Sequence, residues 1–499
     1  MSLLKKLAGE TAIYGVSSIL GRLLNYVVMT FFLTRIFEKS AYGVVSDMYA
    51  TSAILLVLFT YRLETAFFRF GKDKKSLGPV FATSSILLFG TTLFFVFLLL
   101  VFSDPIAVLL EHPGKGHYFR MFAIIIGADA LSSIPFARLR LINRPVVFAS
   151  IKIASIFINI MFILFFLALC PYLIEKGWPL EWLYNEEDRI AYVFLANMIA
   201  SVVMLLLLVP SYFRLKWTFD PALVKKMLLY TWPLIIVSLA GIINQNIGYT
   251  FLKYKASPDP EQNRALMGVF GAAIKIPVLM TLFTQAFNYA AEPFFFRNAE
   301  RDDSRAIYGQ VGQAFTLVAV LVFLGISFYI DLIKLIIGKD LRDGIGIVPI
   351  FLLAYLFLGL FYNFSIWYKL ADRTRMGSLI ALGGLAITLL VNAILVPRIG
   401  IYGPAWAALA CYIFMALAAY FSGQRHYRID YPIRKMAAYL LIGLSAFFIN
   451  DWFRTLWPDQ PILIMGLNSI LLILCLAGIY KIDPNMINGV LRSFRKKKS

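Results

Sequence analysis

The chain has 499 residues, of which 60% are hydrophobic and 15% are charged. A soluble protein carries about 25% charged residues, so this composition excludes a soluble globular protein and indicates a polytopic membrane protein. The formal net charge of +19 lies largely in short loops between apolar runs, which points to membrane topology and not to a nucleic acid partner.

We expect an all-α fold of about fourteen transmembrane helices, taking about twenty apolar residues as one span. The predicted spans are 9–34, 44–68, 80–102, 118–137, 148–170, 190–210, 228–252, 267–292, 309–330, 347–368, 379–396, 404–422, 437–450 and 462–480. Lysines and arginines collect in the loops on the side of the N-terminus, and an even number of spans places both termini there. The positive-inside rule therefore predicts that both termini are cytoplasmic.

The loops contain few residues or motifs that are typical of catalytic sites. The longest, 171–189, is acidic and aromatic, and it is a solvated connection, a segment at the membrane interface or a lid over an outer opening. The histidines are His112, His117 and His426, with no cysteine or acidic partner at the sequence spacing of a metal site. The chain also lacks a phosphate-binding P-loop motif. We therefore expect no metal, no cofactor and no enzymatic activity.

The first span recurs about 220 residues later in the chain. Identities at this offset are mostly polar residues, lysines or glycines: Lys5 with Lys225, Lys6 with Lys226, Thr11 with Thr231, Ser18 with Ser238, Gly21 with Gly241 and Thr30 with Thr250. Six spans separate the starts of the two copies, so both copies cross the membrane in the same direction. This pattern predicts two pseudo-symmetric six-helix lobes, as in transporters that bind substrate between parallel repeats.

The repeat divides the chain into four predicted parts. Residues 1–216 form the N-lobe with spans one to six, and residues 217–436 form the C-lobe with spans seven to twelve. Residues 437–481 add two C-terminal helices outside the repeat, and residues 482–499 form a basic cytoplasmic tail.

Three charged residues lie deep within predicted spans: Arg22, Asp129 and Lys275. A charge at bilayer depth is costly and normally faces protein or water. We interpret Arg22 and Lys275, one from each lobe, as lining a central cavity that attracts an anion. The alternative is that one of them forms a structural ion pair with Asp129. The Asp129 carboxyl group is also the candidate for coupling transport to an ion such as the proton.

Two amides belong to the same predicted cavity. Span seven contains Asn244-Gln245-Asn246 in its middle, and Asn25 in span one is the repeat partner of Gln245. This correspondence favours a position of Asn25 and Gln245 on the cavity, where amides can hydrogen-bond sugar hydroxyls. Lys275 lies two residues before Pro277, and this proline is expected to weaken the eighth span at that point.

Three segments carry a family resemblance: LTRIFEKSAYGVVS (33–46), LRLINRPVVFASI (139–151) and VPRIGIYGPAWAAL (396–409). In this order they resemble polysaccharide flippases, the Wzx-like members of the multidrug/oligosaccharidyl-lipid/polysaccharide exporter superfamily. The resemblance covers nearly the whole chain. It implies a fold like that of multidrug (MATE) transporters and cations from the first and eighth helices in a central cavity. Arg22 and Lys275 stand at comparable positions.

The resemblance also implies a function. Such a flippase moves a lipid-linked oligosaccharide, usually on undecaprenyl diphosphate, across the bacterial inner membrane. Its implied partners are this substrate, membrane lipids and proteins of glycan assembly. Two alternatives remain: a multidrug or cation antiporter of the same superfamily, and a non-catalytic membrane component of a glycan-assembly complex. Neither the sugar nor the coupling ion follows from the sequence.

Overall fold

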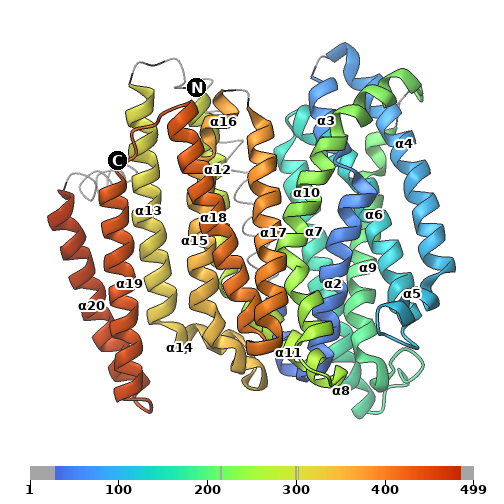
Figure 1. The fold of residues 1–499 in the computed structure, drawn as a ribbon. Coiled ribbons are helices and arrows are strands. Elements are labelled where there is room, and N and C mark those ends of the chain that lie inside the picture. Colours follow the sequence, from blue (N-terminus) through green and yellow to red (C-terminus); the bar gives the residue numbers. More distant parts are fainter. Residues whose placement is uncertain are drawn as a thin grey trace. The chain divides into compact units, whose positions relative to one another are not determined.

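The computed structural model describes residues 28–484, apart from 73, 214–215, 298–300, 302 and 372, and this part of the chain contains helices and no strand (Figure 1). Twelve helices or helix runs in it are long and apolar enough to cross a membrane, and one bent helix pair adds a thirteenth candidate. The expectation of an all-helical polytopic protein is confirmed. The predicted span 9–34 lies almost wholly outside the described residues, so the count of fourteen stays a prediction.

The chain packs as two compact units. Of the described residues, unit 1 contains those up to Phe32 and Ala41–Tyr249, and unit 2 contains Leu33–Ser40 and those from Thr250 onwards. The division of the chain into lobes at 216 and 217, which rests on the repeat, remains a prediction.

Unit 1 is built on one buried central helix and its neighbours. Its elements are α2 (Lys39–Thr60), α3 (Leu63–Phe70), α4 (Lys74–Val101), α5 (Ser103–Leu109), α6 (Gly116–Leu141), α7 (Pro145–Leu164), α8 (Cys170–Glu175), α9 (Arg189–Leu208) and α10 (Pro221–Lys255), the first and last of which cross the border of the unit. Helix α6 is the most buried of the candidate spans and packs against α4, α5 and α9. In contrast, few residues of α4 and α10 are buried.

Aromatic residues tie the helices of unit 1 together at one end. Phe67 of α3, Phe81 of α4 and Ile134 of α6 are fully buried and form one cluster with Met227 of α10. The short helix α3 is separated from α2 by Tyr61 and Arg62, whose φ angles are 31° and 57°. Non-glycine residues seldom adopt positive φ, and this turn redirects the chain so that α3 covers the cluster.

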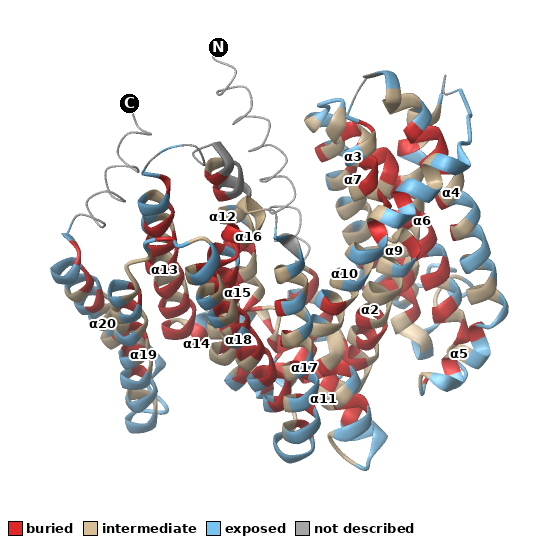
Figure 2. Ribbon diagram, turned by 45° about the horizontal axis from the view of Figure 1, so that its top comes forward, coloured by how far each residue is buried: buried red, intermediate tan, exposed pale blue. Residues whose placement is uncertain are grey.

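Unit 2 is organised around α15 and α18. Its elements are α11 (Pro260–Ala273), α12 (Val278–Arg297), α13 (Ser304–Phe328), α14 (Ile330–Ile333), α15 (Val348–Phe364), α16 (Ile366–Leu370), α17 (Thr374–Ile399), α18 (Tyr402–His426), α19 (Ile433–Leu456) and α20 (Pro461–Ile482). Helix α18 packs along both α15 and α17. On α15, a Cβ at Gly359 would overlap the Phe315 ring of α13, so the glycine permits this close approach. Figure 2 shows that buried positions prevail on α15 and exposed ones on α20.

The last two helices are held to α13 by polar contacts as well as by apolar packing. Near one end, the Asn468 amide of α20 donates to the Phe328 carbonyl at 2.9 Å and to Asn450 Oδ1 of α19 at 2.8 Å. At the other end, Asp483 accepts from Gln313 of α13 at 2.5 Å and from Lys435 of α19 at 2.8 Å. Helices α19 and α20 are therefore a fixed part of unit 2.

Candidate functional site

Lys275 lies in a break between two helices of unit 2. Helix α11 ends at Ala273 and α12 begins at Val278, and the two axes are bent by 45°. The Lys275 amide donates to the Ala272 carbonyl at 3.2 Å, a tight three-residue turn in place of the four-residue turn of an α-helix. Pro277 has no amide hydrogen and disfavours a helical residue before it. The expected weak point at Pro277 is thus confirmed as a break.

Helix α11, which precedes this break, is closely packed against its neighbours. Val269, Ala272 and Ala273 of α11 are buried, and α11 packs against the 3₁₀ segment Lys339–Ile347. In that segment, a Cβ at Gly344 would overlap the Val269 side chain. The half-buried Lys275 therefore follows a helix end whose position is fixed by backbone packing. Broken helices of this kind carry substrate or ion sites in secondary transporters.

Asp129 lies inside unit 1, in the middle of α6. Its carboxyl group lies near Ser201 of α9 and interacts electrostatically with Lys152 of α7. The Lys152 ammonium also lies 4.3 Å from the centroid of the Phe136 ring and contacts the Met204 sulfur at 3.7 Å. The cation beside Asp129 is therefore Lys152, a residue that sequence position alone would place near the membrane surface.

Further polar side chains adjoin this pair on α9. Asn197 Nδ2 donates to the Tyr49 hydroxyl of α2 at 2.9 Å, and Ser201 Oγ donates to Asn197 Oδ1 at 3.4 Å. One face of α9 thus joins α2 and α6 through amide and hydroxyl groups within an apolar bundle. Polar groups buried in this way must satisfy one another, so the arrangement stabilises the interior of unit 1 and also provides groups that could accept or pass a proton.

The amides of α10 do not share one environment. Gln245 is exposed, whereas Asn246 is half-buried and donates to the Ile242 carbonyl of its own helix at 3.0 Å. Gln245 belongs to unit 1 and Lys275 to unit 2. Arg22 and Asn25 lie outside the described residues. The predicted grouping of Arg22, Asn25, Gln245 and Lys275 around one cavity therefore stays a prediction.

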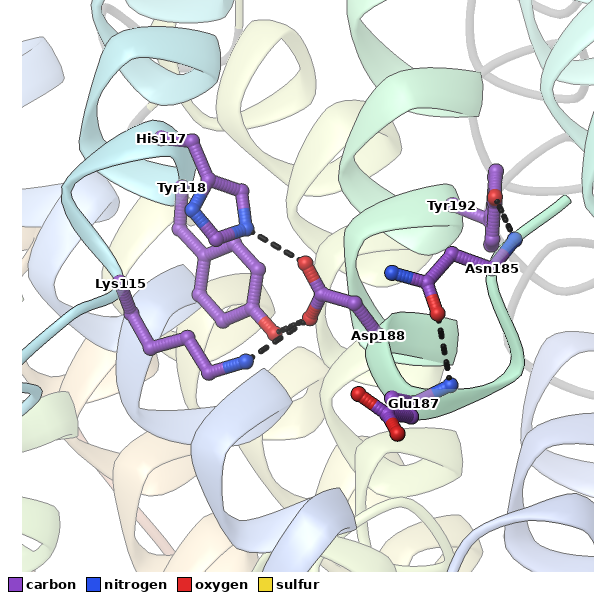
Figure 3. A network of polar contacts seen from close by, with 7 residues as sticks. All are labelled: Lys115, His117, Tyr118, Asn185, Glu187, Asp188 and Tyr192. Carbon is purple, nitrogen blue, oxygen red and sulfur yellow. Dashed lines mark hydrogen bonds and ion pairs between the residues drawn. The ribbon is translucent and has the colours of Figure 1, made fainter. Parts of the chain in front are cut away.

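Two histidines have carboxylate partners that sequence spacing did not reveal. His112 Nε2 lies 2.8 Å from Asp47 Oδ2 of α2, and both side chains are buried. His117 Nε2 lies 2.6 Å from Asp188 Oδ2, and Asp188 also accepts from Lys115 at 3.0 Å and from the Tyr118 hydroxyl (Figure 3). The partners are 65 and 71 residues apart in sequence, so only the packing of the helices brings them together.

The same contacts hold the long loop 171–189. Asp188 attaches its end to the start of α6. The Tyr192 hydroxyl of α9 accepts from the Asn185 amide at 2.6 Å (Figure 3), and it donates to the Leu183 carbonyl at 3.1 Å. The loop nevertheless leaves Trp182 81% exposed. A connection fastened at these points is not a freely moving lid, and its exposed tryptophan is typical of a membrane interface.

Comparisons with known proteins identify the family and the fold. A family model described as polysaccharide biosynthesis protein matches residues 7–299, which is more than half of the chain. A search of curated proteins finds no match.

Three of the solved structures that are similar to this chain illustrate its fold. The lipid II flippase MurJ in an inward closed conformation matches with a TM-score of 0.70 at 15% identity, over 94% of this chain and 98% of that chain. An inward-facing multidrug resistance MATE family transporter of the MOP superfamily matches with a TM-score of 0.62 at 13% identity, over 83% and 94%. The MATE multidrug transporter DinF-BH gives 0.57 at 13% identity, over 85% and 96%. At these identities the likeness shows the fold alone, which is that of flippases and multidrug transporters.

Proposed function

The chain belongs to the polysaccharide biosynthesis protein family, and we propose that it is a flippase for a lipid-linked oligosaccharide. Its substrate would be a polysaccharide repeat unit on undecaprenyl diphosphate. The protein would carry this substrate from the inner to the outer leaflet of a bacterial inner membrane by alternating access, with both termini in the cytoplasm. The observation that supports this proposal most directly is Lys275, a cation placed in the break of a membrane-spanning helix pair.

A diphosphate needs such a cation because its charge is costly to move through hydrocarbon. A unit charge about 4 Å from another contributes roughly 4 kcal/mol at the effective dielectric constant of a partly wet protein site. In the proposed site Lys275 and Arg22 bind the diphosphate, and Asn25 and Gln245 hydrogen-bond the sugar. The polyprenyl tail remains in the bilayer, where its transfer carries no comparable penalty.

The two predicted lobes, residues 1–216 and 217–436, would move relative to each other during transport. Residues 437–481 would travel with the C-lobe, because α19 and α20 are fastened to α13 by Asn468 and Asp483. Parallel repeats of this kind alternate access by rocking around a central substrate site.

Asp129 would serve the coupling of transport to an ion gradient. Its surroundings, with Lys152 and Ser201 nearby, provide a half-buried acid, a neighbouring lysine and a hydroxyl group. Such a group can exchange a proton when the surrounding helices rearrange. If Asp129 and Lys152 only stabilise the structure, transport would instead be driven by the membrane potential or by another ion.

The proposal is tested by leaflet transfer in proteoliposomes. A fluorescent undecaprenyl diphosphate oligosaccharide is placed in one leaflet, and its appearance in the other is followed for the wild type, Lys275→Ala and Lys176→Ala. Lys176 is an exposed lysine of the loop 171–189 and is the matched control. We expect transfer by the wild type and by Lys176→Ala, and loss of transfer by a folded Lys275→Ala variant.

Parallel vesicles containing a fluorescent organic cation of the rhodamine class distinguish the alternatives. Transport of the dye without transfer of the lipid would overturn the proposal in favour of a multidrug antiporter. Transport of neither would favour a structural component of a glycan-assembly complex. Wild-type rates of lipid transfer in Lys275→Ala would remove the proposed role of this cation.

A further inference from the structure

A short stretch of chain joins the first predicted span to α2 and contains a break. Residues 28–36 are helical, Phe37 and Glu38 are not, and α2 begins at Lys39. Residues Leu33–Ser40 pack with unit 2, whereas α2 from Ala41 onwards packs with unit 1. The chain therefore changes units within three residues of a helix break.

The first half of this stretch is held by backbone contacts. Thr34 Oγ1 accepts a hydrogen bond from the Gly338 amide at 2.9 Å, and both residues are buried. A Cβ at Gly338 would overlap the Thr34 carbonyl oxygen, so only glycine allows the two backbones to lie this close. The Arg35 guanidinium adds bonds to the Leu335 carbonyl at 2.6 Å and the Ile336 carbonyl at 3.2 Å. We call this set of contacts the anchor.

The second half contains the buried Phe37, whose amide donates to the Leu33 carbonyl at 3.0 Å, and ends in an exposed ion pair. Lys39 Nζ lies 2.5 Å from Asp343 Oδ2, and the two side chains are 40% and 67% exposed. Water solvates such charges almost as well when they are apart, so an exposed pair breaks and reforms easily. The anchor, in contrast, excludes water around Thr34 and Ile337, which are 3% and 0% exposed.

We propose that Phe37 and Glu38 form a hinge of the transport cycle, a role that rests on the proposed alternating access. Thr34 and Arg35 stay anchored to the segment 335–338 of unit 2 throughout the cycle. From Ala41 onwards α2 follows unit 1, and the Lys39–Asp343 pair, which lies next to the border between the units at Ser40 and Ala41, breaks and reforms with each turnover. Unit 2 thereby fixes the end of the span that carries Arg22 while α2 remains free to swing.

The hinge is tested with two cysteine pairs in a background in which Cys170, Cys411 and Cys475 are replaced by alanine. These three cysteines are buried and form no disulfide with one another, and the background is first checked for folding and transfer. One pair, Arg35→Cys with Leu335→Cys, bridges the anchor. The other, Lys39→Cys with Asp343→Cys, bridges the ion pair. Both are joined by the same short reducible bifunctional thiol linker in reconstituted protein.

We expect the bridge across 39 and 343 to reduce lipid transfer at least tenfold, with recovery after reduction. The bridge across 35 and 335 should change transfer by less than twofold. Equal effects of the two bridges, or inhibition by the anchor bridge alone, would overturn the hinge.

A distance measurement gives a readout that does not depend on transfer. The same pairs are labelled with nitroxides in nanodiscs, and spin–spin distances are recorded with and without undecaprenyl diphosphate. We expect two distance populations for 39 and 343 and one for 35 and 335. Two populations in a protein that transfers no lipid would support the hinge and contradict the proposed substrate. One unchanged distance for 39 and 343 in a protein that does transfer lipid would contradict the hinge and leave the substrate in place.

Discussion

Unit 1 and unit 2 place deep charges in different surroundings. In unit 1, Asp129 meets Lys152 and a hydroxyl group across helix interfaces, so an opposite charge compensates it within the bundle. In unit 2, Lys275 lies where the helix is interrupted and two axes bend by 45°. The two charges therefore differ in the geometry of the helix that carries them. The charge in unit 2 lies at an interrupted helix, the place where secondary transporters receive a ligand.

The largest expected effect comes from removing one member of the compensated pair. Lys152→Met keeps the length of the side chain but leaves the Asp129 carboxylate without its cation, which costs about 3 kcal/mol of unfolding free energy. Denaturant unfolding of the purified protein measures this loss. The double variant Lys152→Met/Asp129→Asn should recover most of it, because neither charge remains. Equal stability of the single and double variants would show that the two side chains are not energetically coupled.

The next effect contrasts two prolines within spans. Pro277 accompanies the break before α12, whereas Pro233 lies inside the continuous helix α10. Pro277→Ala removes the restriction on helical geometry next to Lys275, and we expect lipid transfer to fall by about tenfold without a loss of stability. Pro233→Ala is the matched control and should transfer lipid at the wild-type rate. Unchanged transfer in both variants would mean that the break is not required for function.

The smallest expected effect depends on pH and lies outside the spans. Burial alone would raise the pKa of Asp331 after α13, but the charged groups of Lys334 and Arg454 outweigh burial and hold that pKa below its usual value. A carboxyl group with a lowered pKa in the folded state stabilises the protein above the pKa of the unfolded chain. This contribution is lost as the pH falls through the folded value.

Asp331→Asn should therefore lower the unfolding free energy at pH 7 by roughly 1 kcal/mol, and the difference from wild type should shrink as the pH falls below the usual carboxyl range. Thermal unfolding at several pH values measures this trend. Asp459→Asn changes an exposed carboxyl group and should leave stability nearly unchanged at every pH. A difference at Asp331 that is constant with pH would contradict the role of its charge.

The sequence predicted the helical spans and the break at Pro277 because hydrophobic periods and proline act locally along the chain. It also singled out Asp129 as a charge at depth. It could not identify Lys152 as the partner of Asp129, because that contact depends on how α6 and α7 pack. The pairs His112–Asp47 and His117–Asp188 were missed for the same reason, since their members come from separate elements.

The part of the candidate site that depends on both units could not be predicted from local sequence patterns. Gln245 and Lys275 lie on separate units, and no local pattern states how separate units meet. The repeat that pairs Asn25 with Gln245 shows that the two positions correspond in sequence. That both side chains line one cavity stays a prediction.

The central claim, that Lys275 recognises a diphosphate, is tested most directly by lipid binding in nanodiscs. Affinities for undecaprenyl diphosphate and for undecaprenol are measured for the wild type, Lys275→Gln and the exposed control Lys176→Gln. Our account predicts that Lys275→Gln weakens binding of the diphosphate lipid by about tenfold, equivalent to roughly 1.4 kcal/mol, and leaves the undecaprenol affinity unchanged. Equal affinity of the wild type and Lys275→Gln for undecaprenyl diphosphate would contradict it.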